Sequence, residues 1–190
     1  MTIRQEVQNG FYVALAYLVA SAVVTWLVTP IQRMFIPEVT IFAALLFPPH
    51  GVRVLSAWLF GWRSCLYLYV AVTLTHFVLT PELPLGAKAF TAWAIVSTCA
   101  ALAFSLLRWL GHDYRAMQNE PDQRTWRGLL LVGLVSSVLN SLGHNLLFAG
   151  EIWPVGSLKV FLAFLLGDTL GTLAAFVALM LLLRSLRRLA

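Results

Sequence analysis

Charged residues are scarce in this chain, at 11% of its 190 residues, whereas hydrophobic residues make up 60%. A soluble domain carries about 25% charged and about 45–50% apolar residues. The sequence also lacks a low-complexity run, a convincing repeat and a soluble linker. We therefore expect a single integral membrane domain over residues 1–190, because a separate soluble domain usually needs about 100 residues.

Catalytic and nucleotide-binding motifs are missing as well. The sequence contains no glycine-rich phosphate loop, no nucleophile–base pair and no paired carboxylates. The net charge of +5 comes from arginines at the ends of apolar segments, so it indicates membrane topology and not nucleic-acid binding. Cys65 and Cys99 lie inside apolar segments and are expected to be buried free thiols. We expect neither an enzyme nor a nucleic-acid-binding protein.

Six apolar segments are each near the ~20 residues that a helix needs to cross a bilayer. They predict an all-α, polytopic membrane helix bundle with helices at about 11–28, 39–62, 64–79, 89–110, 128–149 and 160–183. The first run is too long for the apolar part of a signal peptide, so we expect an uncleaved first helix. Tryptophans near the segment ends are expected to anchor the helices at the membrane interfaces: Trp26, Trp62, Trp109, Trp126 and Trp153.

The basic residues predict the orientation of the six helices. With the N-terminus in the cytoplasm, the opposite side holds only Arg33, Lys88 and Lys159. The cytoplasmic side collects nine arginines: Arg4, Arg63, Arg108, Arg115, Arg124, Arg127, Arg184, Arg187 and Arg188. This distribution satisfies the positive-inside rule, so both termini are expected in the cytoplasm.

The second apolar segment is interrupted in its middle. Pro48 and Pro49 remove two backbone donors, and Gly51 loosens the backbone further, so we expect a broken helix. His50 and Arg53 then place a titratable and a charged group where hydrocarbon is expected. An arginine at a helix centre costs roughly 2.5 to 3.5 kcal/mol on a translocon scale, so the rest of the bundle must supply partners.

Four titratable groups on four different helices fall in the outer half of the predicted bilayer: His50, His76, His144 and Asp168. Their polar groups would be unsatisfied if they faced lipid, so we expect them to converge inside the bundle. Arg53 lies one helical turn from His50 and is the expected partner of Asp168. Asn140 and Asn145 add polar groups on the fifth helix.

The predicted site is therefore a polar core for ligand binding or for structure, made of His50, Arg53, His144, Asn145 and Asp168. Structural roles are the alternatives to ligand binding. His76 would then lie at the membrane interface, His144 would lie at a helix kink, and Arg53 and Asp168 would form a purely structural pair. Gly167 and Gly171 flank Asp168 at a spacing that favours close helix packing.

A metal site made from His50, His76, His144 and Asp168, or haem bound by two of these histidines, is an alternative. However, no two of these residues have the HxxxH or ExxH spacing that places two ligands on one helix face. We therefore expect no metal, and the sequence leaves the identity of any cofactor open.

Two stretches resemble a known family. The first consists of Phe47-Pro48-Pro49-His50-Gly51, an apolar run and Gly61-Trp62-Arg63. It resembles the Trp-Pro-Pro-Ala-Gly segment and the Gly-x-Arg of the first class of bacterial membrane-associated sensor domains, the MASE type. Residues 166–173 resemble the Gly-Asp-x-x-Gly-x-Leu helix that closes those domains. Two departures are His50 in place of alanine and the added Arg53.

The resemblance implies a sensor in the bacterial cytoplasmic (inner) membrane. Such domains usually precede a diguanylate cyclase or a histidine kinase and have more spanning helices, whereas only residues 184–190 follow the sixth segment here. It therefore implies a freestanding sensory or accessory subunit that binds a small ligand or senses a membrane signal and relays it to a signalling partner. The other expected partner is the lipid bilayer.

Two other functions fit a six-helix protein with a broken helix. One is the substrate-binding subunit of a vitamin-type uptake transporter, because transporters bind substrates at broken helices near the membrane midplane. The other is an assembly subunit of a larger membrane complex, which needs no ligand at all.

Overall fold

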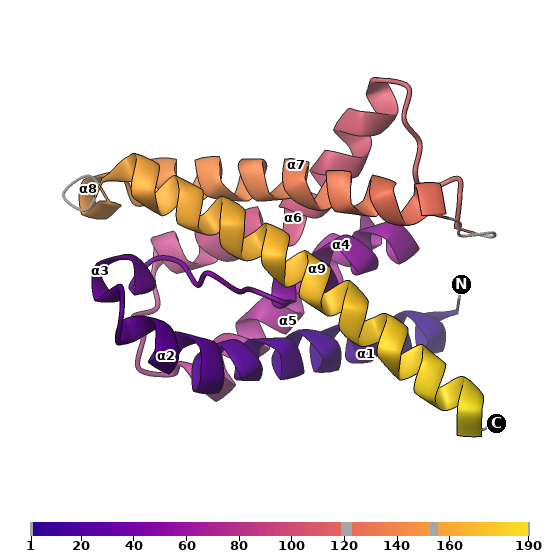
Figure 1. The fold of residues 1–190 in the computed structure, drawn as a ribbon, viewed down its shortest axis with the longest axis horizontal. Coiled ribbons are helices and arrows are strands. Elements are labelled where there is room, and N and C mark those ends of the chain that lie inside the picture. Colours follow the sequence, from indigo (N-terminus) through magenta and orange to yellow (C-terminus); the bar gives the residue numbers. More distant parts are fainter. Residues whose placement is uncertain (1, 119–122, 153–155, 190) are drawn as a thin grey trace.

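The computed structural model describes residues 2–118, 123–152 and 156–189, and it is all-helical over those residues. The elements are α1 (Ile3–Val23), the π-helical turn η1 (Val24–Val28), α2 (Thr29–Arg33), α3 (Pro37–Thr40), α4 (Pro49–Phe60), α5 (Arg63–Leu79), α6 (Ala87–Trp109), α7 (Gln123–Leu147), α8 (Ala149–Ile152) and α9 (Ser157–Leu189). They form an elongated bundle with both termini at one end and α3 and α8 at the other (Figure 1). Trp153, one of the predicted interface anchors, lies outside the described residues.

Four helices are long and apolar enough to cross a membrane: Ile3–Arg33, Ala87–Trp109, Gln123–Leu147 and Ser157–Arg188. Large apolar side chains such as Leu15, Leu102 and Leu170 are exposed on these helices, as expected for contact with lipid. These features identify an all-helical membrane protein, as the composition predicted. The apolar α5 is shorter, with 17 residues, and α4 has only 12.

The first helix runs from Ile3 to Arg33 and contains one π-helical turn. Pro30 explains this turn, because it has no N–H to donate to the carbonyl of Trp26 and its ring crowds that carbonyl. The N–H of Thr29 accordingly bonds five residues back, to the carbonyl of Val24. A proline inside a long helix thus widens one turn without ending the helix.

The predicted helix over residues 39–62 is wrong in its first half. Residues 41–48 are not helical, and α4 begins only at Pro49, with Pro48 as its N-cap. A proline is tolerated in the first turn of a helix because the N–H it lacks would have no partner there. The two prolines therefore start a helix, and the break lies on their N-terminal side.

The side chain of Gln32 holds this non-helical segment in place. Its Nε2 donates to the carbonyl of Ala43 at 2.8 Å, and its Oε1 accepts from the N–H of Leu45 at 2.6 Å. Gln32 is buried, so its amide replaces the water that these backbone groups would otherwise need. Irregular backbone at membrane depth depends on such protein partners.

Helix α9 lies directly against the same segment. The N–H of Phe47 donates to the carbonyl of Gly167 at 2.9 Å. A Cβ on Gly167 would overlap the carbonyl oxygen of Ala44, and a Cβ on Gly171 would overlap the backbone of Phe47. The two glycines thus permit close packing, as their spacing predicted, but their neighbour is an irregular backbone segment.

Candidate functional site

The break in front of α4 places two polar side chains in the centre of the bundle. His50 and Arg53 lie in the first and second turns of α4 and are 0% and 2% exposed. Gly51 faces α9, where an added Cβ would overlap the Cβ of Ala175 and lie 3.2 Å from the Cα of Thr172. The first turn of α4 therefore packs directly on α9.

The imidazole of His50 joins three elements. Its Nε2 lies 3.1 Å from the carbonyl oxygen of Gly133 on α7, and its Nδ1 lies 3.2 Å from Oδ2 of Asp168 on α9. Nη1 of Arg53 is 3.4 Å from the same Nδ1. Because a carbonyl oxygen only accepts, the hydrogen bond to Gly133 requires a proton on Nε2.

Nδ1 of His50 therefore stands between two partners with opposite requirements. A neutral ring, protonated on Nε2, has a lone pair at Nδ1 that accepts from Arg53. A cationic ring carries a proton on Nδ1 and donates it to Asp168. The protonation state of His50 thus decides which of the two contacts is a hydrogen bond.

Arg53 makes its other contacts with aromatic residues. Its Nη2 donates to the hydroxyl of Tyr17 at 3.1 Å, and the guanidinium carbon lies 5.8 Å from the ring centre of Tyr17 and 5.1 Å from that of Phe47. These distances suit cation–π attraction. Nε is buried without a hydrogen-bond partner.

The predicted direct ion pair between Arg53 and Asp168 is therefore wrong. The ion pairs of the described residues include His50 with Asp168 but not Arg53 with Asp168. The physical reason lies in the crossing of the two helices, because the first turn of α4, which carries His50, is the turn that meets α9. Arg53, one turn further along, reaches α1 instead, and His50 bridges it to the carboxylate.

Asp168 is held from α7 as well. Nδ2 of Asn140 donates to its Oδ2 at 2.9 Å, and both side chains are 2% exposed. Oδ1 of Asn140 is buried and has no hydrogen-bond partner. The cluster thus combines a guanidinium, an imidazole, a carboxylate and an amide from three helices, and it retains unused hydrogen-bonding capacity.

A cavity of about 240 Å³ adjoins this cluster. Its polar lining comes from Tyr17, Arg53, Asn140, His144 and Asp168. Its apolar lining comes from Phe42, Ala43, Ala44, Phe47, Val96 and Phe164. Four of these six apolar residues belong to the non-helical segment, so the break both opens the cavity and covers it. His50, which was predicted to belong to the ligand-binding core, is fully buried and does not line this cavity.

His144 presents one ring nitrogen to this region. Its Nδ1 lies 3.0 Å from the carbonyl oxygen of Asn140 and must carry the proton in that hydrogen bond. The ring packs against Phe148 and Phe164, with centroid distances of 6.0 and 5.1 Å. The neutral ring therefore has a free acceptor at Nε2, which makes no hydrogen bond within the described part of the chain.

The structure does not bring two further candidates into the cluster. The side-chain amide of Asn145 donates to the carbonyl of Ser141 on its own helix. His76 is buried and lines another cavity of about 220 Å³ beside Trp93, 5.2 Å away between ring centres. In residues 2–118, 123–152 and 156–189, no three His, Cys, Asp or Glu side chains lie close enough together to bind a metal ion.

Sequence reasoning assigned no role to Tyr17, Gln32 or the carbonyl of Gly133. A tyrosine in an apolar helix resembles any core aromatic, and a backbone carbonyl has no signature in sequence. Gln32 was the detectable residue, because it is a polar side chain next to the end of an apolar run. Its role depends on the position of residues 43–45, which only the fold defines.

The fold and this cluster define a membrane protein with a charged, hydrogen-bonded centre between α1, α4, α7 and α9. Comparison of the chain with protein-family models, curated proteins and solved structures finds no match.

Proposed function

We propose that this protein is a membrane sensory domain that binds a small polar ligand in the cavity beside Arg53, Asn140, His144 and Asp168. The observation that carries the proposal is a buried charged cluster with unused hydrogen-bonding groups next to an open volume. Charged side chains within membrane spans are costly and by default mark functional sites. A purely structural cluster would gain nothing from a cavity beside it.

The size and lining of the cavity restrict the ligand. Its volume of about 240 Å³ is below the ~300–1,000 Å³ of common small-molecule sites. A guanidinium and a carboxylate both line it, so the ligand carries hydrogen-bonding groups that match both charges. Aromatic walls would enclose its apolar part. A small zwitterion or a small carboxylic acid fits these requirements.

Helix α9 is the proposed output element. It carries Asp168 in the membrane and continues to Arg188, about 30 Å further along at 1.5 Å per residue. A ligand or proton that changes the contacts of Asp168 with His50 and Asn140 would favour one position of α9 over another. A cytoplasmic signalling protein would detect that change at the basic end of the helix.

The proposal includes six crossings of the bacterial inner membrane with both termini in the cytoplasm. Residues 41–48 extend at most ~29 Å and α4 adds ~18 Å, which together suffice for a hydrocarbon core of ~30 Å. The 17 residues of α5 supply ~25 Å for the return. The resemblance of residues 47–63 and 166–173 to the MASE-type sensor domains supports the location in the inner membrane, whereas those domains have more spanning helices.

A ligand screen in lipid nanodiscs tests the proposal. The purified protein is heated with a panel of small amino acids, carboxylic acids and amines, and we expect at least one class to raise the melting temperature. The gain should disappear in Asn140→Ala and His144→Ala and persist in His112→Ala, whose side chain is exposed and distant from the cavity lining. Equal responses in all three variants would refute binding at this site.

Substrate uptake is the second candidate, and residues 41–48 favour it. Transporters place unwound backbone and polar groups at the substrate site. Such a subunit would dock on an ATPase and bind its vitamin-like substrate tightly in isolation, whereas a sensor should co-purify with a kinase or a cyclase. An assembly subunit would tolerate alanine at His50, Arg53 and Asp168.

A further inference from the structure

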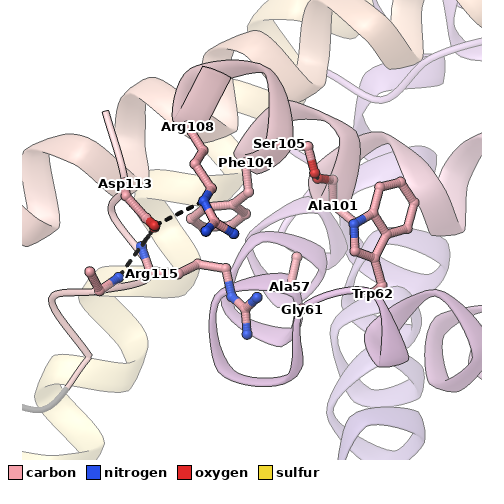
Figure 2. A pocket seen from close by; sticks show the side chains of 10 residues that line it. Ala57, Gly61, Trp62, Ala101, Phe104, Ser105, Arg108, Asp113 and Arg115 are labelled. Atoms are coloured by element: carbon pink, nitrogen blue, oxygen red, sulfur yellow. Dashed lines mark hydrogen bonds and ion pairs between the residues drawn. The ribbon is translucent and has the colours of Figure 1, made fainter. Parts of the chain in front are cut away.

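A further pocket lies at the end of the bundle that contains both termini, away from the buried cluster and from the cavity at His76. It has a volume of about 220 Å³ and is formed by the C-terminal ends of α4 and α6 and the turn that follows α6. Figure 2 shows Arg108, Asp113 and Arg115 on one side of it and Gly61 and Trp62 on the other. The proposed sensory function does not use this pocket.

Both arginines are anchored through one edge of the guanidinium. Nε of Arg108 lies 3.2 Å from Oδ2 of Asp113, and Nε of Arg115 donates to the carbonyl of Trp58 at 3.2 Å. The other carboxylate oxygen of Asp113 accepts from the backbone N–H groups of Arg115 and Ala116 at 3.2 and 3.3 Å. The Nη groups of both arginines make no hydrogen bond within the described residues, so they remain available to a ligand.

Gly61 makes room for the guanidinium of Arg115. A Cβ at position 61 would lie 2.5 Å from Nη1, 2.7 Å from Cζ and 2.8 Å from Nη2 of Arg115. Gly61 also has a φ of +59°, which favours glycine. The backbone at the end of α4 is thus shaped to hold this arginine over the pocket.

The charge and position of the pocket indicate its ligand. Two guanidiniums oppose one carboxylate, which leaves one excess positive charge, and arginine binds phosphate through paired N–H groups. Trp62 and Trp109 are 56% and 84% exposed near the pocket, as expected for side chains at the membrane–water interface. The phosphates of phospholipids lie at this depth.

From these observations, we propose that the pocket between Gly61, Arg108 and Arg115 binds a phosphate group. The phosphate belongs to an anionic phospholipid headgroup or to a small soluble phosphate. Either ligand would connect the turn after α6 to the end of α4. It would thereby stabilise the C-terminal ends of α4 and α6.

The test uses the full chain and two phosphate sources. In detergent, inorganic phosphate is titrated against chloride at equal ionic strength, and the melting temperature is followed. In nanodiscs, retention of phosphatidylglycerol over phosphatidylcholine is measured by native mass spectrometry after release from the disc. We expect Arg108→Gln and Arg115→Gln to weaken binding about tenfold or more.

Two further variants separate geometry from charge. Arg124→Gln removes the same charge from α7 without touching the pocket and should bind as the wild type does. Gly61→Ala keeps both charges but displaces Arg115, and it should weaken binding. If Arg115→Gln or Gly61→Ala does not fold, Arg108→Gln still decides.

Each outcome is decisive. Protection by inorganic phosphate identifies a soluble source, and selective retention of phosphatidylglycerol alone identifies a lipid. The proposal is overturned if neither probe binds, or if Arg124→Gln loses as much affinity as Arg108→Gln.

Discussion

Nδ1 of His50 lies 3.2 Å from Oδ2 of Asp168, and this contact joins the broken second segment to the last helix of the bundle. It occurs where α4 and α9 cross, and it is supported from α7 by Gly133 and Asn140. Arg53 supplies the positive charge of the cluster but reaches the carboxylate only through the imidazole. The arrangement is a relay of three side chains in which the middle one can change its charge.

Asp168→Asn tests the electrostatic role of the carboxylate. The amide keeps the size of the side chain but leaves the charge of Arg53 buried without a counter-ion. The free energy of unfolding should therefore fall by about 3–5 kcal/mol. The melting temperature in detergent measures the loss, with the exposed Glu82→Gln as a control for removal of one negative charge. Adding Arg53→Met should recover part of the stability. An unchanged melting temperature of Asp168→Asn would contradict the relay.

Gly167→Ala tests the contact between α9 and the non-helical segment. The new methyl group would overlap the carbonyl oxygen of Ala44, and backbone cannot move aside as a flexible side chain can. We expect a loss of stability of about 1–3 kcal/mol or more. Gly150→Ala is the matched control, because a Cβ there meets nothing within 4 Å. Equal stability of the two variants would show that the segment does not pack on α9.

Gln32→Leu tests the support of residues 43–45. It leaves the carbonyl of Ala43 and the N–H of Leu45 without their partner, and each lost partner costs about 1–3 kcal/mol. Hydrogen exchange at the amide of Leu45 should accelerate strongly. Gln8→Leu, on the exposed face of α1, should leave that exchange rate as it is. Slow exchange in Gln32→Leu would mean that another group protects this backbone.

The number of crossings can be measured at the turn between α4 and α5. With Cys65 and Cys99 replaced by alanine, Trp62→Cys should react with a membrane-impermeant thiol reagent only from the cytoplasmic side if the chain crosses six times. If only the four long helices cross, position 62 stays on the side of residues 80–86. A Glu82→Cys variant gives the reference for that outer side.

The sequence predicted the parts of this structure that depend on local chemistry. A low charge content and long continuous apolar runs predict an all-helical membrane protein, because a helix satisfies its own backbone hydrogen bonds in lipid. Pro48 and Pro49 were sufficient to locate the break, since two adjacent prolines remove two backbone donors and crowd the turn before them. The burial of His50, Arg53 and Asp168 also followed from the cost of exposing them to hydrocarbon.

The tertiary structure determined which residues contact one another. Helical spacing places His50 and Arg53 on one face of α4, but the angle at which α4 crosses α9 determines that the imidazole, and not the guanidinium, reaches Asp168. The roles of Tyr17, Gln32 and Gly133 arise in the same way, from contacts between residues far apart in the chain. Composition and local pattern determine which residues must be buried, whereas helix crossing sets their partners, because a crossing depends on the packing of the whole bundle.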